Sequence, residues 1–344
     1  MKKIIKENSI EEKLARIIEV INKNQRFFLA GHINPDGDTI GSMLAISSVL
    51  RRLGKKTYLF SHDPVPENLG FFSEFRKIKV GCLPKAPYEV MILLECSTLK
   101  RAGNLRGFEK KAKQIINIDH HKTAVNFGDI NLVDSTSSST AEIIYRLFER
   151  MGVRVNQKEA RYLYVGIVTD TGRFQFPSTN SGTHMTAARL LETGFNFANV
   201  NKYLYATSSF PSLKILGKAL ASLELSKSGR TALMFLKKED FLQFNASVEH
   251  SENIINYGMM IPGVKISVLF REEPGRVSVT FRSKGKIDIS LVARRFGGGG
   301  HKYAAGCRLK MPFDEVVEKI RAVVLELSLI HISEPTRPLY ISYA

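Results

Sequence analysis

Side chains that commonly bind divalent cations occur in three short clusters, and each cluster directly follows an apolar run typical of a buried strand. The clusters are His32, Asp36 and Asp38; Glu95; and Asp119, His120 and His121. Carboxylate oxygens bind hard cations such as Mg²⁺ and Mn²⁺, and Mn²⁺ also accepts imidazole nitrogen. Because ligand sites of open α/β sheets lie at the carboxyl ends of the strands, we expect these side chains to meet. The pattern predicts a pair of divalent cations that acts on a phosphoester.

Each cluster also has a simpler interpretation when it is taken alone. The two acids in 36–38 suit a helix-capping turn as well as they suit a metal. Neighbouring side chains of an extended segment point to opposite sides. One of His120 and His121 can therefore bind a cation while the other supports a ligand or meets substrate, although a hydrogen-bonded core pair is the alternative. Asp170 is a fourth element, and alone it is typical of a turn at a helix end. The coincidence of all four favours the metal site.

A glycine run near the carboxyl end of the chain is the second chemical signal. Gly297–Gly300 precede His301, and successive backbone N–H groups of such a run can hold a phosphate. Arg282, on a preceding β-type segment, offers a charged contact to the same group. A glycine run is often only a flexible linker. The regular segments on both sides of this run favour a substrate loop.

Hydrophobic spacing predicts an α/β protein in which helices alternate with strands of a parallel sheet. In the first part we expect helices at 9–23, 39–53, 138–151 and 157–169, and strands at 26–30, 57–60, 90–94 and 114–118. Further on we expect a long helix at 210–226, strands at 231–236, 265–271 and 276–281, and a helix at 290–296. The corresponding division is a parallel-sheet domain at 1–208, a connector helix at 209–228 and a smaller α/β domain at 229–326.

Composition limits the choice of partners and compartment. The chain has 344 residues, 44% of them apolar, which suffices for two cores. Lysine and arginine number 50 against 33 acids, a net charge of +17, and this favours polyanionic partners such as nucleotides and nucleic acid. Three separated cysteines and the lack of a signal-like or membrane-spanning apolar segment predict a cytoplasmic protein with no membrane contact. Formation of a homodimer stays open.

The segment 327–344 differs from the rest of the chain. Its beginning, LSLIHISEPTR, resembles the translation of a sequencing adapter, and we expect these residues not to be natural. The alternative is a genuine edge strand with a tail interrupted by proline.

Taken together, the motifs resemble those of the DHH phosphoesterases that carry a DHH-associated C-terminal domain. Among these, the chain resembles the bacterial bifunctional oligoribonuclease and 3′-phosphoadenosine 5′-phosphate phosphatases, over about residues 10 to 326. The matching segments are HINPDGDTIGS at 32–42, DHH at 119–121, VGIVTDTGRF at 165–174, and FGGGGH at 296–301 with AAG at 304–306. Together these motifs are highly specific.

The resemblance implies a Mn²⁺-dependent enzyme with two metal ions and a site between two domains. It assigns His32 and Asp36 to one ion, assigns Asp38, His120 and Asp170 to the other, and makes the acid at position 95 the bridge. Asp is usual at that position, so Glu95 departs from the pattern, but its longer arm carries the same carboxylate. By the same analogy His121 assists at the scissile phosphate, with Asp38 and His120 also catalytic. A substrate phosphate would be held by residues of the C-terminal domain, namely Gly297, Gly298, Gly299, Gly300, His301 and Arg282.

The expected function is hydrolysis of short oligoribonucleotides to mononucleotides and of 3′-phosphoadenosine 5′-phosphate to AMP. A cyclic or linear dinucleotide phosphodiesterase would use the same residues. A non-catalytic nucleotide- or RNA-binding module, in which Glu95 has ended turnover, is the alternative from another class.

Overall fold

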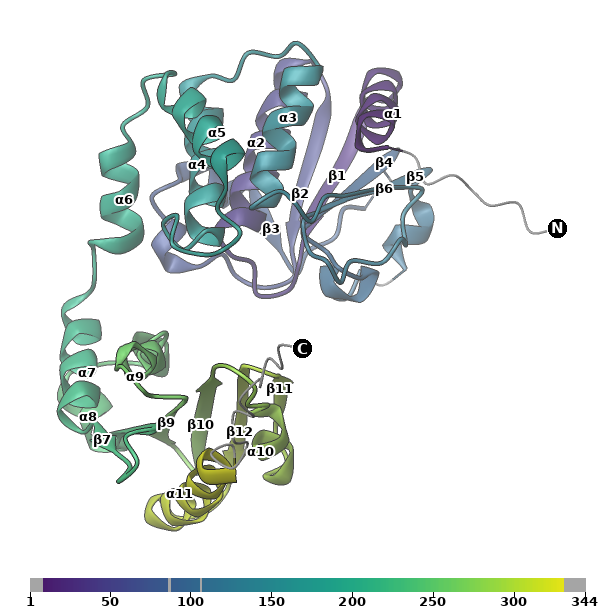
Figure 1. The fold of residues 1–344 in the computed structure, drawn as a ribbon. Helices are drawn as coiled ribbons and strands as arrows, with labels where there is room; N and C mark the ends of the chain where they lie inside the picture. Colours follow the sequence, from purple (N-terminus) through teal and green to yellow (C-terminus); the bar gives the residue numbers. More distant parts are fainter. Residues whose placement is uncertain (1–8, 86–87, 106, 331–344) are drawn as a thin grey trace, which may run out of the picture. The chain divides into compact units, whose positions relative to one another are not determined.

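A computed structural model of the chain describes residues 9–85, 88–105 and 107–330, and Figure 1 shows its elements in chain order. The chain divides into two units, Met1–Thr207 and Ser208–Ala344.

The N-terminal unit is built on a six-stranded sheet with the order β3-β2-β1-β4-β5-β6, and every pairing in it is parallel. The strands are β1 (Arg26–Gly31), β2 (Lys56–Ser61), β3 (Ile78–Val80), β4 (Val90–Leu94), β5 (Gln114–Asp119) and β6 (Ile130–Val133). The strand order reverses between β1 and β4. In sheets of this kind the crevice at such a reversal is where ligands bind. The expected α/β class with a parallel sheet is confirmed.

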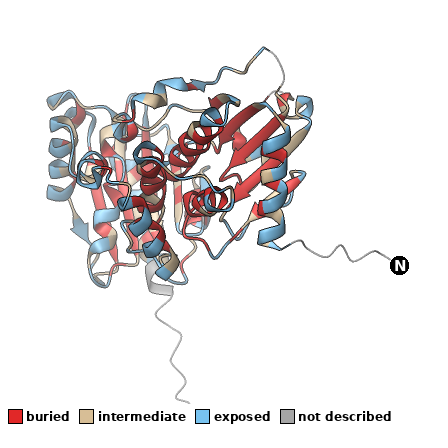
Figure 2. Cartoon of the chain, turned by 90° about the horizontal axis from the view of Figure 1, so that it is seen from above, coloured by how far each residue is buried: buried red, intermediate tan, exposed pale blue. Residues whose placement is uncertain are grey.

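Helices α1 (Ile10–Lys23), α2 (Gly37–Arg52) and α3 (Thr140–Arg150) pack on one face of this sheet, and short turns cover the other. The helices α4 (Gln157–Asp170), α5 (Ser181–Leu191) and α6 (Phe197–Tyr205) form a further layer, in which α4 packs on α2 and α3, and α5 and α6 pack on α4. The sheet has one hydrophobic core on each face, and successive residues of β1 point to opposite cores. Phe27 and Leu29 pack with the helices, whereas Phe28 packs with Ala102 and Phe108 on the other face. Figure 2 shows the buried strands and the buried central helix in red. Burial on both faces explains why the central strands are continuous apolar runs.

Two glycines let α2 and α4 approach each other closely. A Cβ at Gly41 would lie 2.3 Å from the carbonyl oxygen of Tyr162, and a Cβ at Gly166 would lie 2.7 Å from Oδ1 of Asp38. Larger residues would separate the two helices. The close crossing brings Asp38, near the start of α2, beside α4, which ends at Asp170.

The C-terminal unit has a mixed six-stranded sheet with the order β11-β12-β10-β9-β8-β7. Its strands are β7 (Glu224–Leu225), β8 (Thr231–Leu236), β9 (Ile266–Glu273), β10 (Arg276–Ser283), β11 (Gly299–His301) and β12 (Ala304–Leu309). Residues from α10 (Ser290–Arg295) and α11 (Phe313–Ile330) pack on one face. Residues from α7 (Phe210–Ala221), α8 (Lys238–Gln243) and α9 (Ile255–Met260) pack on part of the other.

The helix expected at 210–226 is shorter in the structure. Helix α7 ends at Ala221, and Glu224–Leu225 form β7. The Ser222 hydroxyl lies 2.8 Å from the carbonyl oxygen of Ala219 and accepts a hydrogen bond from the N–H of Phe235 at 2.9 Å. This link to β8 favours a turn where helical periodicity alone predicts continuation.

The segment 327–344 is only partly described. Its first four residues continue α11 to Ile330, and Leu327 packs against the core of the unit. The remaining residues, 331–344, lie outside the described part, so the prediction of a non-native tail stays a prediction.

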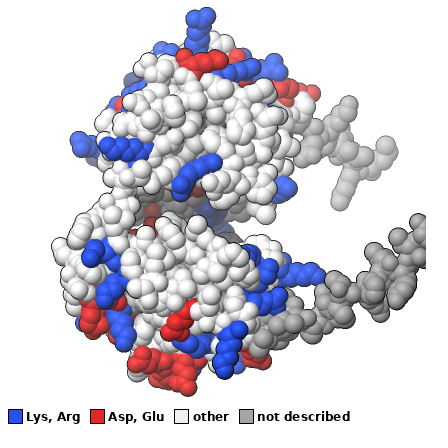
Figure 3. Space-filling model, turned by 60° about the vertical axis from the view of Figure 1, so that its left-hand side comes forward, with Lys and Arg blue, Asp and Glu red and all other residues white. Residues whose placement is uncertain are grey.

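No helix in the described ranges is both long and apolar enough to cross a bilayer. On the face drawn in Figure 3, Lys and Arg are scattered rather than gathered in one patch.

Candidate metal centre

The loop after β1 presents His32 and Asp36 to the edge of the sheet. Nδ1 of His32 lies 2.7 Å from the carbonyl oxygen of Ile33, so that nitrogen donates and Nε2 keeps its lone pair. Asp36 is the N-cap of α2 and accepts the N–H of Thr39 at 3.0 Å. Its second oxygen, Oδ2, lies 3.7 Å from Nε2 of His32. Burial opposes the charge of Asp36, but its contacts with His32 and Thr39 prevail and lower its pKa to about 2.

Asp38 is fully buried and is held by the N-terminus of α3. Its Oδ2 accepts the N–H of Thr140 at 2.6 Å, and its Oδ1 accepts the N–H of Ala141 at 2.9 Å and the Ser42 hydroxyl at 3.2 Å. Burial and the nearby Asp170 carboxylate raise the pKa of Asp38 to about 7. The carboxylate is thus fixed in position, and a nearby cation would favour its charged form.

Glu95 follows β4 and lies between the two histidines. Its Oε2 lies 3.7 Å from Nε2 of His32, and its Oε1 lies 3.9 Å from Nε2 of His120. Thr39 donates its hydroxyl to Oε2 at 2.6 Å. The backbone of Glu95 has φ of 59°, which is uncommon for a residue other than glycine and is frequent at functional sites. Burial and the Asp38 carboxylate raise its pKa well above the ordinary value.

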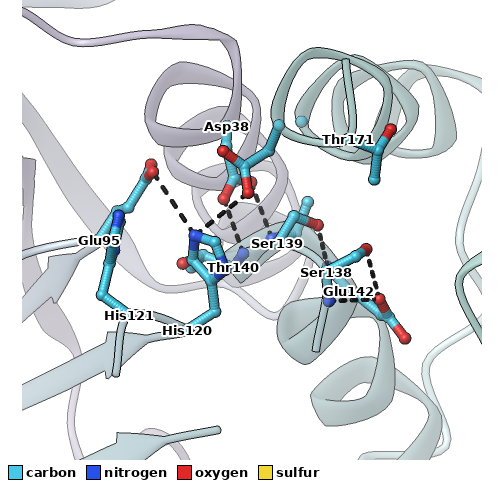
Figure 4. A network of polar contacts seen from close by, with 12 residues as sticks. Asp38, Glu95, His120, His121, Ser138, Ser139, Thr140, Glu142 and Thr171 are labelled. Atoms are coloured by element: carbon cyan, nitrogen blue, oxygen red, sulfur yellow. Dashed lines mark hydrogen bonds and ion pairs between the residues drawn. The ribbon is translucent and has the colours of Figure 1, made fainter. Parts of the chain in front are cut away.

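His120 completes a second set of ligand atoms with Asp38 and Asp170. Nε2 of His120 lies 3.2 Å from Oδ2 of Asp170. That nitrogen is buried and has no hydrogen-bond partner among the described residues. Burial and the Asp36 carboxylate raise the pKa of Asp170 to about 7. Figure 4 shows Glu95 and His120 pointing toward each other, with Asp38 above them.

Asp119 and His121 form a pair beside this set. Oδ1 of Asp119 lies 2.8 Å from Nδ1 of His121 and also accepts the N–H of His121 at 2.9 Å. Asp119 is fully buried, whereas the His121 side chain is 44% exposed. The hydrogen bond that His121 donates to the Asp119 carboxylate raises the pKa of His121. The pair fixes a half-exposed imidazole at the edge of the cluster.

The cluster has an excess of negative charge that a cation would relieve. The four carboxylates are Asp36, Asp38, Glu95 and Asp170, and in the described part of the chain none of them forms an ion pair with Lys or Arg. Three groups have ligand atoms within 4.8 Å of one another: His32, Asp36 and Glu95; Asp38, His120 and Asp170; and Glu95, His120 and His121. Glu95 and His120 therefore connect the sets. Three features of the cluster suit divalent cations: the carboxylates repel one another, Nε2 of His120 has no hydrogen-bond partner among the described residues, and the donors include both oxygen and nitrogen.

The structure brings together the metal-site residues named from the sequence, which are His32, Asp36, Asp38, Glu95, His120 and Asp170, and it places the expected catalytic residue His121 beside them. The C-terminal candidates are arranged differently from the expected cradle. The N–H groups of Gly297 and Gly298 bond to the carbonyl oxygens of Arg294 and Ala293, so they close the end of α10. Gly299 and Gly300 belong to β11 and pair with β12.

Arg282 and His301 give no further support to that cradle. Arg282 donates to the carbonyl oxygen of its neighbour Phe281 at 3.1 Å. The His301 side chain lies outside the described part of the chain. The role of these C-terminal residues in substrate binding stays a prediction.

Sequence reasoning missed the groups that hold the ligands in place. They are Thr39, Ser42, Asp119 in its pairing with His121, and the backbone N–H groups of Thr140 and Ala141. The segment before α3 is itself held, because Glu142 accepts both the N–H and the hydroxyl of Ser138, at 3.0 and 2.6 Å (Figure 4). The available signal was the serine run 137–139, which marks a capped helix start but does not say what that helix faces.

A parallel sheet that delivers carboxylates and imidazoles to its strand ends defines a metal-dependent class of α/β protein. Comparison with known proteins specifies the family. Residues 26–167 match the model of the DHH family, N-terminal domain, and residues 230–327 match that of the DHHA1 domain. The chain belongs to the DHH family of phosphoesterases.

Two relatives and one solved structure illustrate the similarity. The bifunctional oligoribonuclease and PAP phosphatase NrnA of Bacillus subtilis is 29% identical over 85% of this chain and 92% of its own length. A Mycoplasma pneumoniae protein described as a homologue of the uncharacterized protein MG371 is 33% identical over 85% of this chain and 89% of its own length. An exopolyphosphatase-related protein from Bacteroides fragilis superposes with a TM-score of 0.85 at 25% identity, covering 96% of this chain and 99% of that one.

Proposed function

We propose that the chain is a metal-dependent phosphoesterase that hydrolyses short oligoribonucleotides to mononucleotides and 3′-phosphoadenosine 5′-phosphate to AMP. The observation that carries this proposal is the position of Glu95, whose two oxygens face two separate sets of ligand atoms. A shared carboxylate is what a site for two neighbouring cations requires. The similarity to the Bacillus subtilis enzyme over nearly the whole of both chains supports the choice of substrates.

The residues would divide the work as their positions suggest. His32 and Asp36 would hold one cation, Asp38, His120 and Asp170 the other, and Glu95 would bridge the two. Mixed imidazole and carboxylate donors favour Mn²⁺. The cations would supply positive charge to the phosphoryl oxygens and a water of lowered pKa.

His121 is the proton donor in this proposal. Hydrolysis adds one water: a new P–O bond forms, the old P–O bond breaks, and the leaving oxygen takes up a proton. His121 is exposed on one side and fixed by Asp119 on the other, and its raised pKa keeps it protonated further toward neutral pH. Asp119 holds the ring and favours its charged form.

A substrate panel tests the proposal. The full chain is incubated with Mn²⁺ and 3′-phosphoadenosine 5′-phosphate, a labelled RNA trimer, a labelled RNA 24-mer or cyclic di-AMP, with and without chelator. We expect the first two to be hydrolysed and the chelator to stop both reactions. Fastest turnover of cyclic di-AMP would instead identify a dinucleotide phosphodiesterase. Binding without turnover across the panel would identify a binding module. We further propose that the chain acts in the cytoplasm and forms a homodimer. Sedimentation measures the second property.

A further inference from the structure

A cavity of about 300 Å³ lies within the N-terminal unit, between the end of α2, the beginning of α4 and the 3₁₀ turn Ser73–Lys77. Each of these three elements contributes basic side chains to its lining, which are Arg51 and Arg52 of α2, Lys77 of the turn, and Lys158 of α4. The same lining contains the acid Glu74. The cavity is therefore strongly basic.

Two ion pairs neutralise the acids at this cavity. Nζ of Lys158 lies 2.7 Å from Oε1 of Glu74. Nε of Arg52 lies 3.0 Å from Oε1 of Glu159, a fully buried residue at the cavity's edge on α4. These two acids already have cationic partners within the unit, so they do not cancel the charge of the other basic side chains.

Arg51 and Lys77 remain without an acid. Neither of them forms an ion pair within the part of the chain that the structure describes. The Arg51 guanidinium is held in place by Thr57, whose hydroxyl accepts its Nε–H at 2.7 Å. A fixed guanidinium and an unpaired ammonium group on the wall of one cavity favour a ligand with negative charge.

Tyr162 adds an uncharged donor to this lining. Its side chain is fully buried, and its hydroxyl makes no hydrogen bond of ordinary geometry with the described residues. Burial and the nearby Glu74 raise the pKa of this hydroxyl, so it stays protonated. A buried donor without a good acceptor is costly. A ligand that carries acceptor oxygens would remove that cost.

The cavity is remote from the metal centre. At a rise of about 1.5 Å per residue, Arg51 lies about 20 Å along α2 from Asp38, and Lys158 lies about 18 Å along α4 from Asp170. The cavity thus lies at the opposite ends of the two helices that carry these metal-site acids. A mononucleotide is too short to contact both places.

We propose that this cavity binds a small phosphate-bearing anion, distinct from the substrate, through Arg51, Lys77 and the hydroxyl of Tyr162. The fork of a guanidinium group matches two oxygens of a phosphate, an ammonium group supplies a point charge, and the hydroxyl donates a third contact. The volume lies at the lower end of the range for small-molecule sites, which favours a free metabolite over an RNA chain. The inference does not depend on the proposed function, because it involves none of the metal-site residues.

The test measures pyrophosphate binding to the full-length, chelator-treated chain by calorimetry. Lys77→Ala removes an exposed charge that forms no ion pair within the described residues, and it should weaken binding about tenfold, as expected for a lost charged contact. Lys79→Ala is the matched control, because Lys79 is exposed, lies two residues further on and is outside the lining. It should bind as the wild type does. Equal affinity in Lys77→Ala and Lys79→Ala would refute the site.

Two further variants test the remaining contacts. Arg51→Ala should weaken binding at least about tenfold, and Arg51→Lys should recover part of the loss. Tyr162→Phe keeps the buried ring and removes the hydroxyl, so affinity should fall about fivefold. Pyrophosphate should also raise the Tm of the wild-type chain, since a ligand that binds only the folded state stabilises it. Unchanged affinity in both Arg51→Ala and Tyr162→Phe would overturn the assignment.

Two comparisons separate this cavity from other anion sites. Asp170→Asn alters the metal centre and should leave pyrophosphate binding unchanged. If Asp170→Asn changes the affinity and Lys77→Ala does not, the anion binds at the metal centre and the proposal fails. If an RNA trimer binds in a Lys77-dependent manner and pyrophosphate does not bind, the cavity holds RNA instead of a small anion. Failure of the chain to hydrolyse nucleotides would refute the proposed function alone, because pyrophosphate binding is measured without turnover.

Discussion

The two units concentrate opposite charges in different structural settings. In the N-terminal unit, four carboxylates and the imidazoles of His32 and His120 meet at the ends of parallel strands, and no Lys or Arg of the described residues pairs with the acids. In the C-terminal unit, Arg271 and Arg308 flank a serine in the middle of a sheet face, and neither forms an ion pair within the described residues.

The difference shows how each kind of site is assembled. Acids can be delivered by loops at strand ends because the crossovers of a parallel sheet bring those loops to one edge. Arginines on antiparallel strands are aligned by register instead, since paired residues share a face. The acidic arrangement is electrostatically incomplete by itself, because none of the described lysines and arginines forms an ion pair with its carboxylates.

The largest expected effect comes from removing one carboxylate of the metal centre. Asp170→Asn removes one carboxylate charge while keeping the size of the side chain, and Asp170 makes no described hydrogen bond to the backbone that the change would disturb. We expect at least about a 100-fold loss of Mn²⁺ affinity, because loss of a ligand should exceed the 10- to 100-fold cost of losing a supporting group. Calorimetric titration with Mn²⁺ measures this, with Asp314→Asn in the exposed first turn of α11 as the control. Wild-type affinity in Asp170→Asn would remove Asp170 from the site.

A change of pH should test the buried carboxylates of the metal centre without mutation. Burial, together with the neighbouring carboxylates, raises the pKa of Asp38 and of Asp170 to about 7. In the metal-free protein their contribution to stability is fully present below the unfolded pKa near 4 and is lost as pH rises through about 7. The Tm of chelated protein should therefore fall between about pH 5 and about pH 7.

Mn²⁺ affinity should change in the opposite direction over the same interval. Protons compete with the cation for the same carboxylates, so affinity should rise about tenfold or more per pH unit. Thermal melts at a series of pH values check the fall in Tm, and calorimetry at the same pH values checks the rise in Mn²⁺ affinity. A Mn²⁺ affinity that does not change with pH would contradict the carboxylate assignment.

The smallest expected effect concerns a supporting group. Thr39→Val keeps the shape of a fully buried side chain but removes the hydroxyl that donates to Glu95 at 2.6 Å. We expect Mn²⁺ affinity to fall about tenfold, the lower end of the range for such contacts. Thr39→Ser keeps the hydroxyl and should bind Mn²⁺ nearly as well as the wild type. Electron paramagnetic resonance of free Mn²⁺ follows both variants, and equal loss in the two would indicate a packing effect.

Much of the N-terminal fold was predictable because its signals are local. Buried strands such as Val90–Leu94 read as apolar runs, and capped amphipathic helices such as α1 show helical spacing. The short strand β3 gave no such signal, because only Ile78 of its three residues is buried. The end of α7 was missed since it depends on the contact of Ser222 with the distant Phe235.

The sequence by itself determined which residues can bind cations and that they follow strands, because side-chain chemistry and apolar periodicity are properties of short segments. Only the tertiary structure decided that Glu95 faces both histidines, that the start of α3 holds Asp38, and that Arg271 and Arg308 share one row with Ser278. These relations join residues far apart in the chain. They follow from the order of the strands, their register and the close crossing of α2 and α4, none of which is encoded in a local pattern.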